Sequence, residues 1–160
     1  MHEYDADWLG EKANSTSRHR CHVSEPRILV TAFPPFSNLE TNVSESVLER
    51  LERDGIDGLD VVTRMLSVDE AGSSAVATEI RDGIEVDGIL HLGLAQRRTG
   101  ICLERLARNS YSMTEPDNSG RLEESGSIVA YGPDALETTA SIHVLDEEFE
   151  HDPDVQWSKD

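Results

Sequence analysis

RILVTAFPPF, residues 27–36, is a short apolar run that ends at two prolines. An apolar run of this length, without polar alternation, is typical of a strand that a sheet buries on both faces. We therefore expect ordered structure to begin at Arg27, with a strand over 28–33. Pro34 and Pro35 end that strand because proline has no amide hydrogen for a sheet ladder.

Helical and strand patterns alternate after this run. Residues 44–53 predict a helix that Asn42 or Ser44 can cap, and residues 69–82 predict a second one. Strands are expected at 59–66 and 88–92. The apolar stripes of the two helices comprise Val43, Val47, Leu48 and Leu51 in the first, and Ala71, Ala75, Val76 and Ile80 in the second. This strand-helix alternation predicts an α/β sheet with helices on its faces.

Residues 93–160 follow a different pattern. A polar loop, 93–100, leads into an alternating stretch that predicts one half-exposed strand over 101–108. We expect a loop over 109–124, a short strand over 127–131 and a helix over 134–148, with Pro133 in its favoured first turn. A further segment begins at 155–157.

The chain is strongly acidic. It holds 32 acidic and 14 basic residues among 160, which gives a formal net charge of −18. The acidic residues form no block, and salt screens the self-repulsion of such a charge. We therefore favour a salt-adapted (halophilic) protein over an ordinary acidic one. The same charge argues against a nucleic-acid partner and against anionic membrane surfaces.

The first 26 residues read as a polar extension, either disordered or produced by a start assigned too early in the gene. They contain no apolar core of a secretory signal, and no run in the chain approaches the ~20 apolar residues of a membrane span. A cytoplasmic location is the resulting expectation, with residues 27–160 as one partial α/β domain.

The sequence predicts neither a metal site nor a cofactor. The stretch 18–22, RHRCH, has the wrong spacing for structural zinc. The two cysteines, Cys21 and Cys102, form no CxxC motif. Nucleotide-binding glycine motifs, HExxH and GxSxG are also missing.

One carboxylate stands out within the alternating stretch. Glu104 lies between apolar neighbours on its predicted strand face, with Arg97, Arg98 and Arg105 close in sequence. It is either one partner of a surface ion pair on an edge strand or part of a site. The residues by themselves lead no further than a soluble α/β domain.

Three stretches resemble the pyroglutamyl-peptidase I (pyrrolidone-carboxylate peptidase) family. TAFPPF at 31–36, followed by Asn42 and Ser44, is similar to its opening motif, Thr-Gly-Phe-x-Pro-Phe-Gly-Gly and then Asn-Pro-Ser. GLA at 93–95, Arg98 and ICLERLARN at 101–109 resemble its glutamate signature. PDN at 116–118 with Gly120 resembles its next loop, and Gly132-Pro133 the start of its next helix. The resemblance implies a three-layer α/β/α sandwich around a mostly parallel sheet.

The resemblance also implies roles for four residues. Phe33 and Phe36 match aromatics that wall the pyroglutamyl-ring pocket, although both can equally be core residues after a strand. Glu104 matches the catalytic glutamate, and Asp117 matches an acidic residue that orients a histidine. In the family, a cysteine thiolate attacks the pyroglutamyl carbonyl of an N-terminal pyroglutamyl peptide and that histidine is its base.

Several positions depart from the family pattern, and Ala32, Pro34, Ser37 and Asn38 alter its opening motif. Leu94 replaces a glutamine that contacts the lactam, and Gln96-Arg97 replaces two glycines. Thr114-Glu115 replaces an Arg-Ile pair whose arginine helps to bind the oxyanion. These changes affect both the ring pocket and the oxyanion site.

The nucleophile and its base have no counterpart in the chain. The family continues past 155–160 into Ala-Gly-x-Phe-x-Cys-Asn and a later histidine, whereas Cys102 stands at a Ser/Thr position, and His91 and His143 read as structural. We therefore expect a C-terminally truncated member, with an incomplete sheet and no peptidase activity by itself. The alternatives are a non-catalytic pyroglutamyl-ligand binding module and a partner-dependent interaction protein, which would form a homo-oligomer or bind the missing C-terminal fragment.

Overall fold

The computed structural model describes residues 24–37 and 39–158. Most of the expected extension, 1–26, and the whole RHRCH stretch therefore lie outside the described residues. Within the described part of the chain, no helix combines the length and the apolar character that crossing a bilayer requires.

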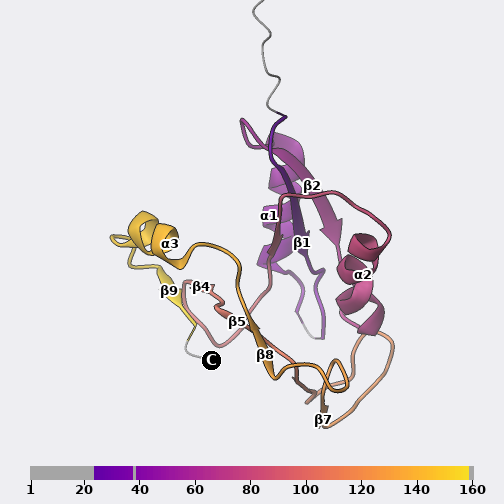
Figure 1. Ribbon diagram of the computed structural model, residues 1–160. Coiled ribbons are helices and arrows are strands. Elements are labelled where there is room, and N and C mark those ends of the chain that lie inside the picture. Colours follow the sequence, from indigo (N-terminus) through magenta and orange to yellow (C-terminus); the bar gives the residue numbers. More distant parts are fainter. Residues whose placement is uncertain (1–23, 38, 159–160) are drawn as a thin grey trace, which may run out of the picture.

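A three-stranded parallel sheet forms the centre of the molecule (Figure 1). β1 (Arg27–Ala32) is the middle strand, with β2 (Asp60–Met65) on one side and β3 (Gly88–His91) on the other. Leu29 to Ala32 are buried. The apolar run that begins the predicted fold is thus a central strand, as expected for a strand covered on both faces.

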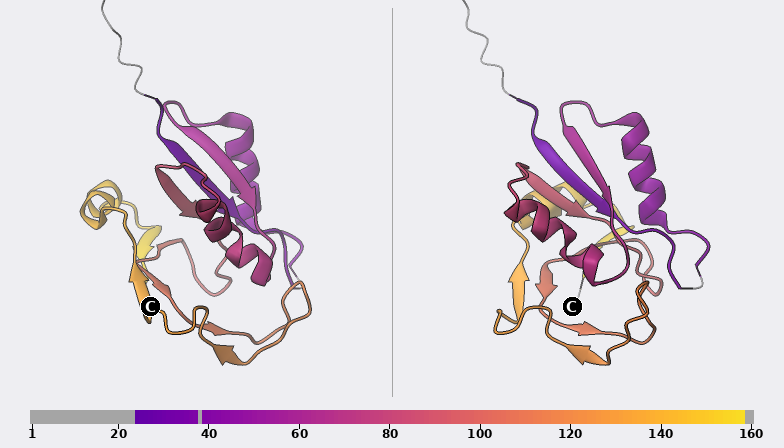
Figure 2. Two further views of the ribbon diagram at one scale, coloured as in Figure 1. Left: turned by 45° about the vertical axis from the view of Figure 1, so that its right-hand side comes forward. Right: turned by 90° about the vertical axis from the view of Figure 1, so that its right-hand side faces the viewer.

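Two helices cover the opposite faces of this sheet, which gives three layers (Figures 1 and 2). Leu48 of α1 (Val43–Asp54) packs with Val30 and Ala32, and Val76 of α2 (Glu70–Arg81) packs with Leu29 and Leu66. The α/β architecture expected from the alternation is confirmed. The predicted stripes are right only in part, because four of their members are exposed: Val43, Val47, Ala71 and Ile80.

Buried hydrogen bonds join the N-terminus of α1 to the loop that follows β1. Asn42 caps the helix, and its Oδ1 accepts from the Ser44 amide at 3.0 Å and from the Ser44 hydroxyl at 2.8 Å. Its Nδ2 donates to the Pro34 carbonyl at 3.2 Å, and the Phe33 amide donates to Ser44 Oγ at 3.2 Å. Asn42 is 1% exposed and Ser44 3%, so a polar pair in the core fixes how the chain leaves β1.

The predicted strand over 101–108 is wrong as a single element. β4 (Ile101–Leu103) pairs in parallel with β9 (Val155–Trp157), whereas β5 (Leu106–Arg108) pairs antiparallel with β8 (Ala135–Glu137). The alternation is genuine, but its two halves take different partners. Glu104 and Arg105 form the joint between them.

Three other predicted elements differ from the structure. The 109–124 loop includes β6 (Tyr111–Ser112), which pairs with β7 (Ser125–Gly126). Residues 127–131 form a turn rather than a strand, and Tyr131 has a left-handed φ of 61°. The last helix, α3 (Ile142–Phe149), begins after the Ser141 cap and not near Pro133, because residues 135–137 are held in the β5–β8 ladder.

Buried residues are confined to the first half of the fold. Every buried residue among the described ones lies between Leu29 and Val76, and none lies within 77–158. Residues 101–158 run beside and beyond the carboxyl ends of the central strands in both views of Figure 2. The stability of the described chain therefore rests on β1 to β3 and their two helices.

Two neighbouring residues of α1 test this division. Leu48 is 2% exposed and Val47 is 42% exposed. We predict that Leu48→Ala lowers the free energy of unfolding by about 2–5 kcal/mol, since it opens a cavity against β1. Val47→Ala, a change on the same helix, should lower it by about 0.5 kcal/mol or less. Urea unfolding followed by circular dichroism measures both, and equal losses would contradict the assignment of the core.

Candidate active site

The carboxyl edge of the parallel sheet gathers the loops that the resemblance singled out. The chain leaves β1 through 33–42 toward α1, and it leaves the neighbouring strand β3 through 92–100 toward β4. Loops that diverge from adjacent parallel strands leave a crevice in which open α/β proteins bind ligands. The geometry therefore places a candidate site between these two loops.

Phe33 and Phe36 stand on the first of these loops, and both are half-buried. Phe33 packs against the Leu29–Leu66–Val76 cluster, so at least part of its ring serves the core. Phe36 lies in the turn that its carbonyl closes with the Leu39 amide, at 3.2 Å. The two alternatives for these residues are a wall of the ring pocket and packing in the core, and Phe33 packs in the core.

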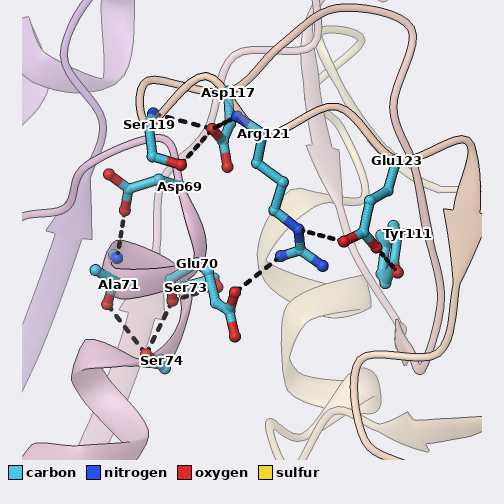
Figure 3. Close-up of polar contacts among 11 residues, drawn as sticks. Asp69, Glu70, Ala71, Ser73, Ser74, Tyr111, Asp117, Ser119, Arg121 and Glu123 are labelled. Atoms are coloured by element: carbon cyan, nitrogen blue, oxygen red, sulfur yellow. Dashed lines mark hydrogen bonds and ion pairs between the residues drawn. The ribbon is translucent and has the colours of Figure 1, made fainter.

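Asp117 lies on a loop that docks onto the start of α2. The Asn118 amide donates to the Val68 carbonyl at 2.9 Å, which ties this loop to the carboxyl end of β2. Asp117 Oδ1 accepts from Ser119 Oγ at 2.7 Å and from the amides of Ser119 and Arg121, each at 2.9 Å (Figure 3). These hydrogen bonds, the Ser119 hydroxyl first, lower the pKa of Asp117 and keep it ionised.

A second carboxylate lies near Asp117. Asp69 caps α2, and its Oδ1 accepts from Ser67 Oγ at 2.6 Å and from the Gly72 amide at 2.8 Å. Those bonds lower the pKa of Asp69, although the charge of Asp117 pushes it upward. Gly72 is required here, since a Cβ would meet the Ser67 carbonyl oxygen at 1.9 Å.

Arg121 connects this loop to two further acidic residues (Figure 3). Its guanidinium pairs with Glu70 at 3.0 Å and with Glu123 at 2.9 Å, and lies 5.3 Å from the centre of the Tyr111 ring. The Arg121 hydrogen bond, with one from the Tyr111 hydroxyl, lowers the pKa of Glu123 to about 2. The bond to Glu123 in turn raises the pKa of Tyr111.

Glu104 is not buried, contrary to its sequence setting. Its side chain is 54% exposed at the joint between β4 and β5, and Arg98 Nη1 lies 2.5 Å from Glu104 Oε1. This is the surface ion pair that formed one of the two alternatives for Glu104. It also joins the glutamate to the loop that follows β3.

A cavity of about 360 Å³ adjoins this ion pair. The loop after β3 and the β4–β9 ladder form its walls, and its lining includes Arg97, Arg98, Thr99, Cys102, Gln156 and Trp157. Gly100 permits the loop after β3 to approach the backbone just before β9. A Cβ at this position, whose φ is 77°, would meet the Asp154 carbonyl oxygen at 2.4 Å. Phe33, Phe36, Glu104 and Asp117 do not belong to this lining, so the structure does not gather all four predicted residues around one cavity.

The remaining candidate groups have other contacts. His91 ends the edge strand β3 and shares a 2.7 Å hydrogen bond with Thr31 Oγ1, and desolvation lowers its pKa. His143 lies in α3, 3.5 Å from Glu147. Cys102 is half-buried in β4, 3.7 Å from Gln156 Nε2. Over residues 24–37 and 39–158, no three His, Cys, Asp or Glu side chains come together as a metal site.

Sequence reasoning missed the contribution of Arg121, Tyr111 and Glu123, which fix the Asp117 loop, and of Gln156, which lines the cavity. No local motif marks them, since each contact joins separate segments. Only the closeness of Arg121 to PDN at 116–118 pointed to this region. Ser37 and Glu115, which both depart from the family pattern, are also in contact. The Ser37 hydroxyl donates a hydrogen bond to the Glu115 carboxylate.

Comparison with known proteins gives one consistent family. The family model described as Pyroglutamyl peptidase matches residues 26–152. A pyrrolidone-carboxylate peptidase 1 from Ralstonia nicotianae is 34% identical over 120 residues, 75% of this chain and 56% of the relative. A pyrrolidone-carboxylate peptidase from Coprothermobacter proteolyticus is 33% identical over 74% of this chain and 58% of its own length.

Solved structures agree. A pyrrolidone carboxyl peptidase from Fervidobacterium islandicum superimposes with a TM-score of 0.74 at 31% identity, over 84% of this chain and 66% of that one. The corresponding protein from Thermus thermophilus gives 0.70 at 36% identity, over 82% and 68%. The chain thus spans less than three fifths of the length of the two curated relatives.

The Arg121 network predicts an acid titration. A lowered pKa means that the stabilisation from Glu123 is complete above its ordinary pKa of about 4.3 and is lost as pH falls toward 2. We expect Arg121→Gln to raise the pKa of Glu123 toward that ordinary value, and Arg108→Gln to leave it unchanged. Carboxyl-carbon NMR titration measures this pKa. A wild-type Glu123 that titrates near 4 would show that the Arg121 contact does not hold in solution.

Proposed function

Because this chain belongs to the pyroglutamyl peptidase family, we propose that it forms the glutamate-bearing part of a site that removes N-terminal pyroglutamate from peptides. The observation that carries the proposal is the position of Glu104 within the matched residues. It is paired to Arg98 and stands beside the cavity between the β3 loop and β4.

The proposed roles follow from the surroundings of each side chain. Arg98 orients Glu104, so that its carboxylate can act on groups bound beside the cavity. Asp117 is an ionised carboxylate held by three donors, a suitable partner for an imidazole N–H. Phe36, and the part of Phe33 that the core leaves open, provide apolar surface for a small neutral lactam.

Cys-His chemistry needs a thiol and an imidazole within hydrogen-bond reach. Among the described residues, Cys102 contacts Gln156, His91 bonds Thr31, His143 lies beside Glu147, and His151 is exposed in the turn after α3. We therefore propose that residues 1–160 by themselves do not cleave pyroglutamyl peptides, and that cleavage needs a cysteine and a histidine from additional sequence. A cytoplasmic location remains part of this proposal.

Hydrolysis of pyroglutamyl-aminomethylcoumarin tests the function. We expect no cleavage by residues 1–160. A chimaera in which the C-terminal part of the Ralstonia nicotianae relative follows Trp157 should cleave, and Glu104→Gln in that chimaera should lower kcat/KM by about 10²-fold or more. Glu150→Gln, an exposed control, should leave the rate unchanged.

Three results would count against parts of this proposal. Cleavage by residues 1–160 would show that the nucleophile lies within them. Full activity of the Glu104→Gln chimaera would remove Glu104 from the chemistry. Saturable binding of a pyroglutamyl peptide, with a chimaera that folds yet never cleaves, would favour the non-catalytic binding module instead.

The acidic composition supports a further proposal, that the protein works at high salt. With a net charge of −18, repulsion weakens the compact state at low ionic strength. We expect the melting temperature to rise as KCl increases from ~0.1 M to ~1 M, where the Debye length falls from ~10 to ~3 Å. A thermal-melt series in KCl measures this, and a flat or falling curve would rule out salt adaptation.

A further inference from the structure

Arg97 has a contact pattern unlike that of the other arginine in the cavity. Arg98 is bound to Glu104, whereas no acidic residue among residues 24–37 and 39–158 pairs with Arg97. Acidic residues outnumber basic ones by 32 to 14 in this chain. Four other described arginines, Arg53, Arg81, Arg105 and Arg108, also have no carboxylate partner among residues 24–37 and 39–158, but none of them lines the cavity, whereas Arg97 does.

The rest of the cavity wall suits a small polar anion. Thr99 adds a hydroxyl, and Gln156 adds a side-chain amide. The Gln156 Nε2 group donates a hydrogen bond to the Thr99 carbonyl at 3.3 Å, which holds this amide in place. Trp157 is held by its indole N–H, which donates to Asp146 at 2.5 Å, and provides an apolar surface. A volume of about 360 Å³ is at the small end of the range for small-molecule sites.

The position of the cavity connects it to the proposed chemistry. Arg98 both lines the cavity and binds Glu104 at 2.5 Å, so a ligand in the cavity lies one side chain away from that glutamate. Arg97 also occupies a position where the family pattern has glycine, so its side chain is an addition relative to that pattern.

We propose that Arg97, with Thr99 and Gln156, forms a carboxylate subsite beside Glu104. The subsite selects short pyroglutamyl peptides that carry a free carboxylate close to the lactam, such as pyroglutamyl dipeptides. A planar guanidinium matches a carboxylate with two parallel hydrogen bonds, which neither an amide nor an ester can accept equally well. This substrate preference rests on the proposed function, whereas the anion site itself does not.

Binding measurements on the whole chain test the subsite. The probes are acetyl-alanine, pyroglutamyl-alanine and the C-terminal amide of each, at ~0.15 M ionic strength. Trp157 fluorescence reports on the cavity, with Trp8→Phe as the background that leaves Trp157 as the remaining tryptophan. We expect both acids to bind about 10- to 100-fold more tightly than their amides.

Variants identify the group responsible. Arg97→Gln should remove the preference for acids while leaving amide binding unchanged, and Arg97→Lys should keep part of it. Arg108→Gln is the matched control, since it removes the same charge from an exposed position on β5 away from the cavity. Equal binding of acids and amides, or equal losses in Arg97→Gln and Arg108→Gln, would overturn the subsite.

The two proposals fail in different ways. If both acids bind but pyroglutamyl-alanine has no advantage over acetyl-alanine, the carboxylate subsite stands and the pyroglutamyl function loses support. If pyroglutamyl-alanine and its amide bind equally and Arg97→Gln changes nothing, the function can stand and the subsite is wrong. Inorganic phosphate that binds as tightly as the acids and competes with them would also overturn carboxylate selection.

Discussion

The buried hydrogen bonds of Asn42 and Ser44 are the constraint on which the candidate site depends. Asn42 caps α1 and at the same time holds the Pro34 carbonyl, and Ser44 holds the Phe33 amide. Asn42 is 1% exposed and Ser44 3%, so water has little access to their side chains, and an unsatisfied buried polar group costs about 1–3 kcal/mol. The path from β1 to α1, and with it the position of Phe33 and Phe36, is therefore set by the same interactions that begin the helix.

Two carboxylates near the carboxyl ends of the sheet strands, Asp117 and Glu104, have different electrostatic surroundings. Asp117 is surrounded by neutral donors on its own loop, which lower its pKa. Glu104 is matched instead by one cation, Arg98, which lies on the loop after β3. The two carboxylates therefore differ in what orients them, which is consistent with the different roles proposed for them.

The first half of the fold could be predicted because its signals are local. Residues 27–92 carry apolar runs, caps and stripes that each specify one element, and all five elements are present. The second half depends on pairing between distant segments, so the alternation of 101–108 could not show that Leu103 pairs with Trp157 while Leu106 pairs with Glu137. The site was predictable only where motif residues are contiguous. Contiguous motifs indicate Glu104 and Asp117 as candidates and place Arg98 near Glu104 in sequence, but they show neither the exposure of Glu104 nor the contacts of Arg121 with Glu70 and Tyr111.

Residues that depart from the family pattern contact one another or line the cavity near the candidate site. Ser37 and Glu115 both depart from that pattern, and they bond to each other across the loops that carry Phe36 and Asp117. Arg97 departs as well, and it lines the cavity beside the Arg98–Glu104 pair. The Ser37–Glu115 hydrogen bond lies at the surface and links the two loops. Residues that depart from the family pattern thus contact one another or line the cavity, while Glu104 is paired with Arg98 beside them.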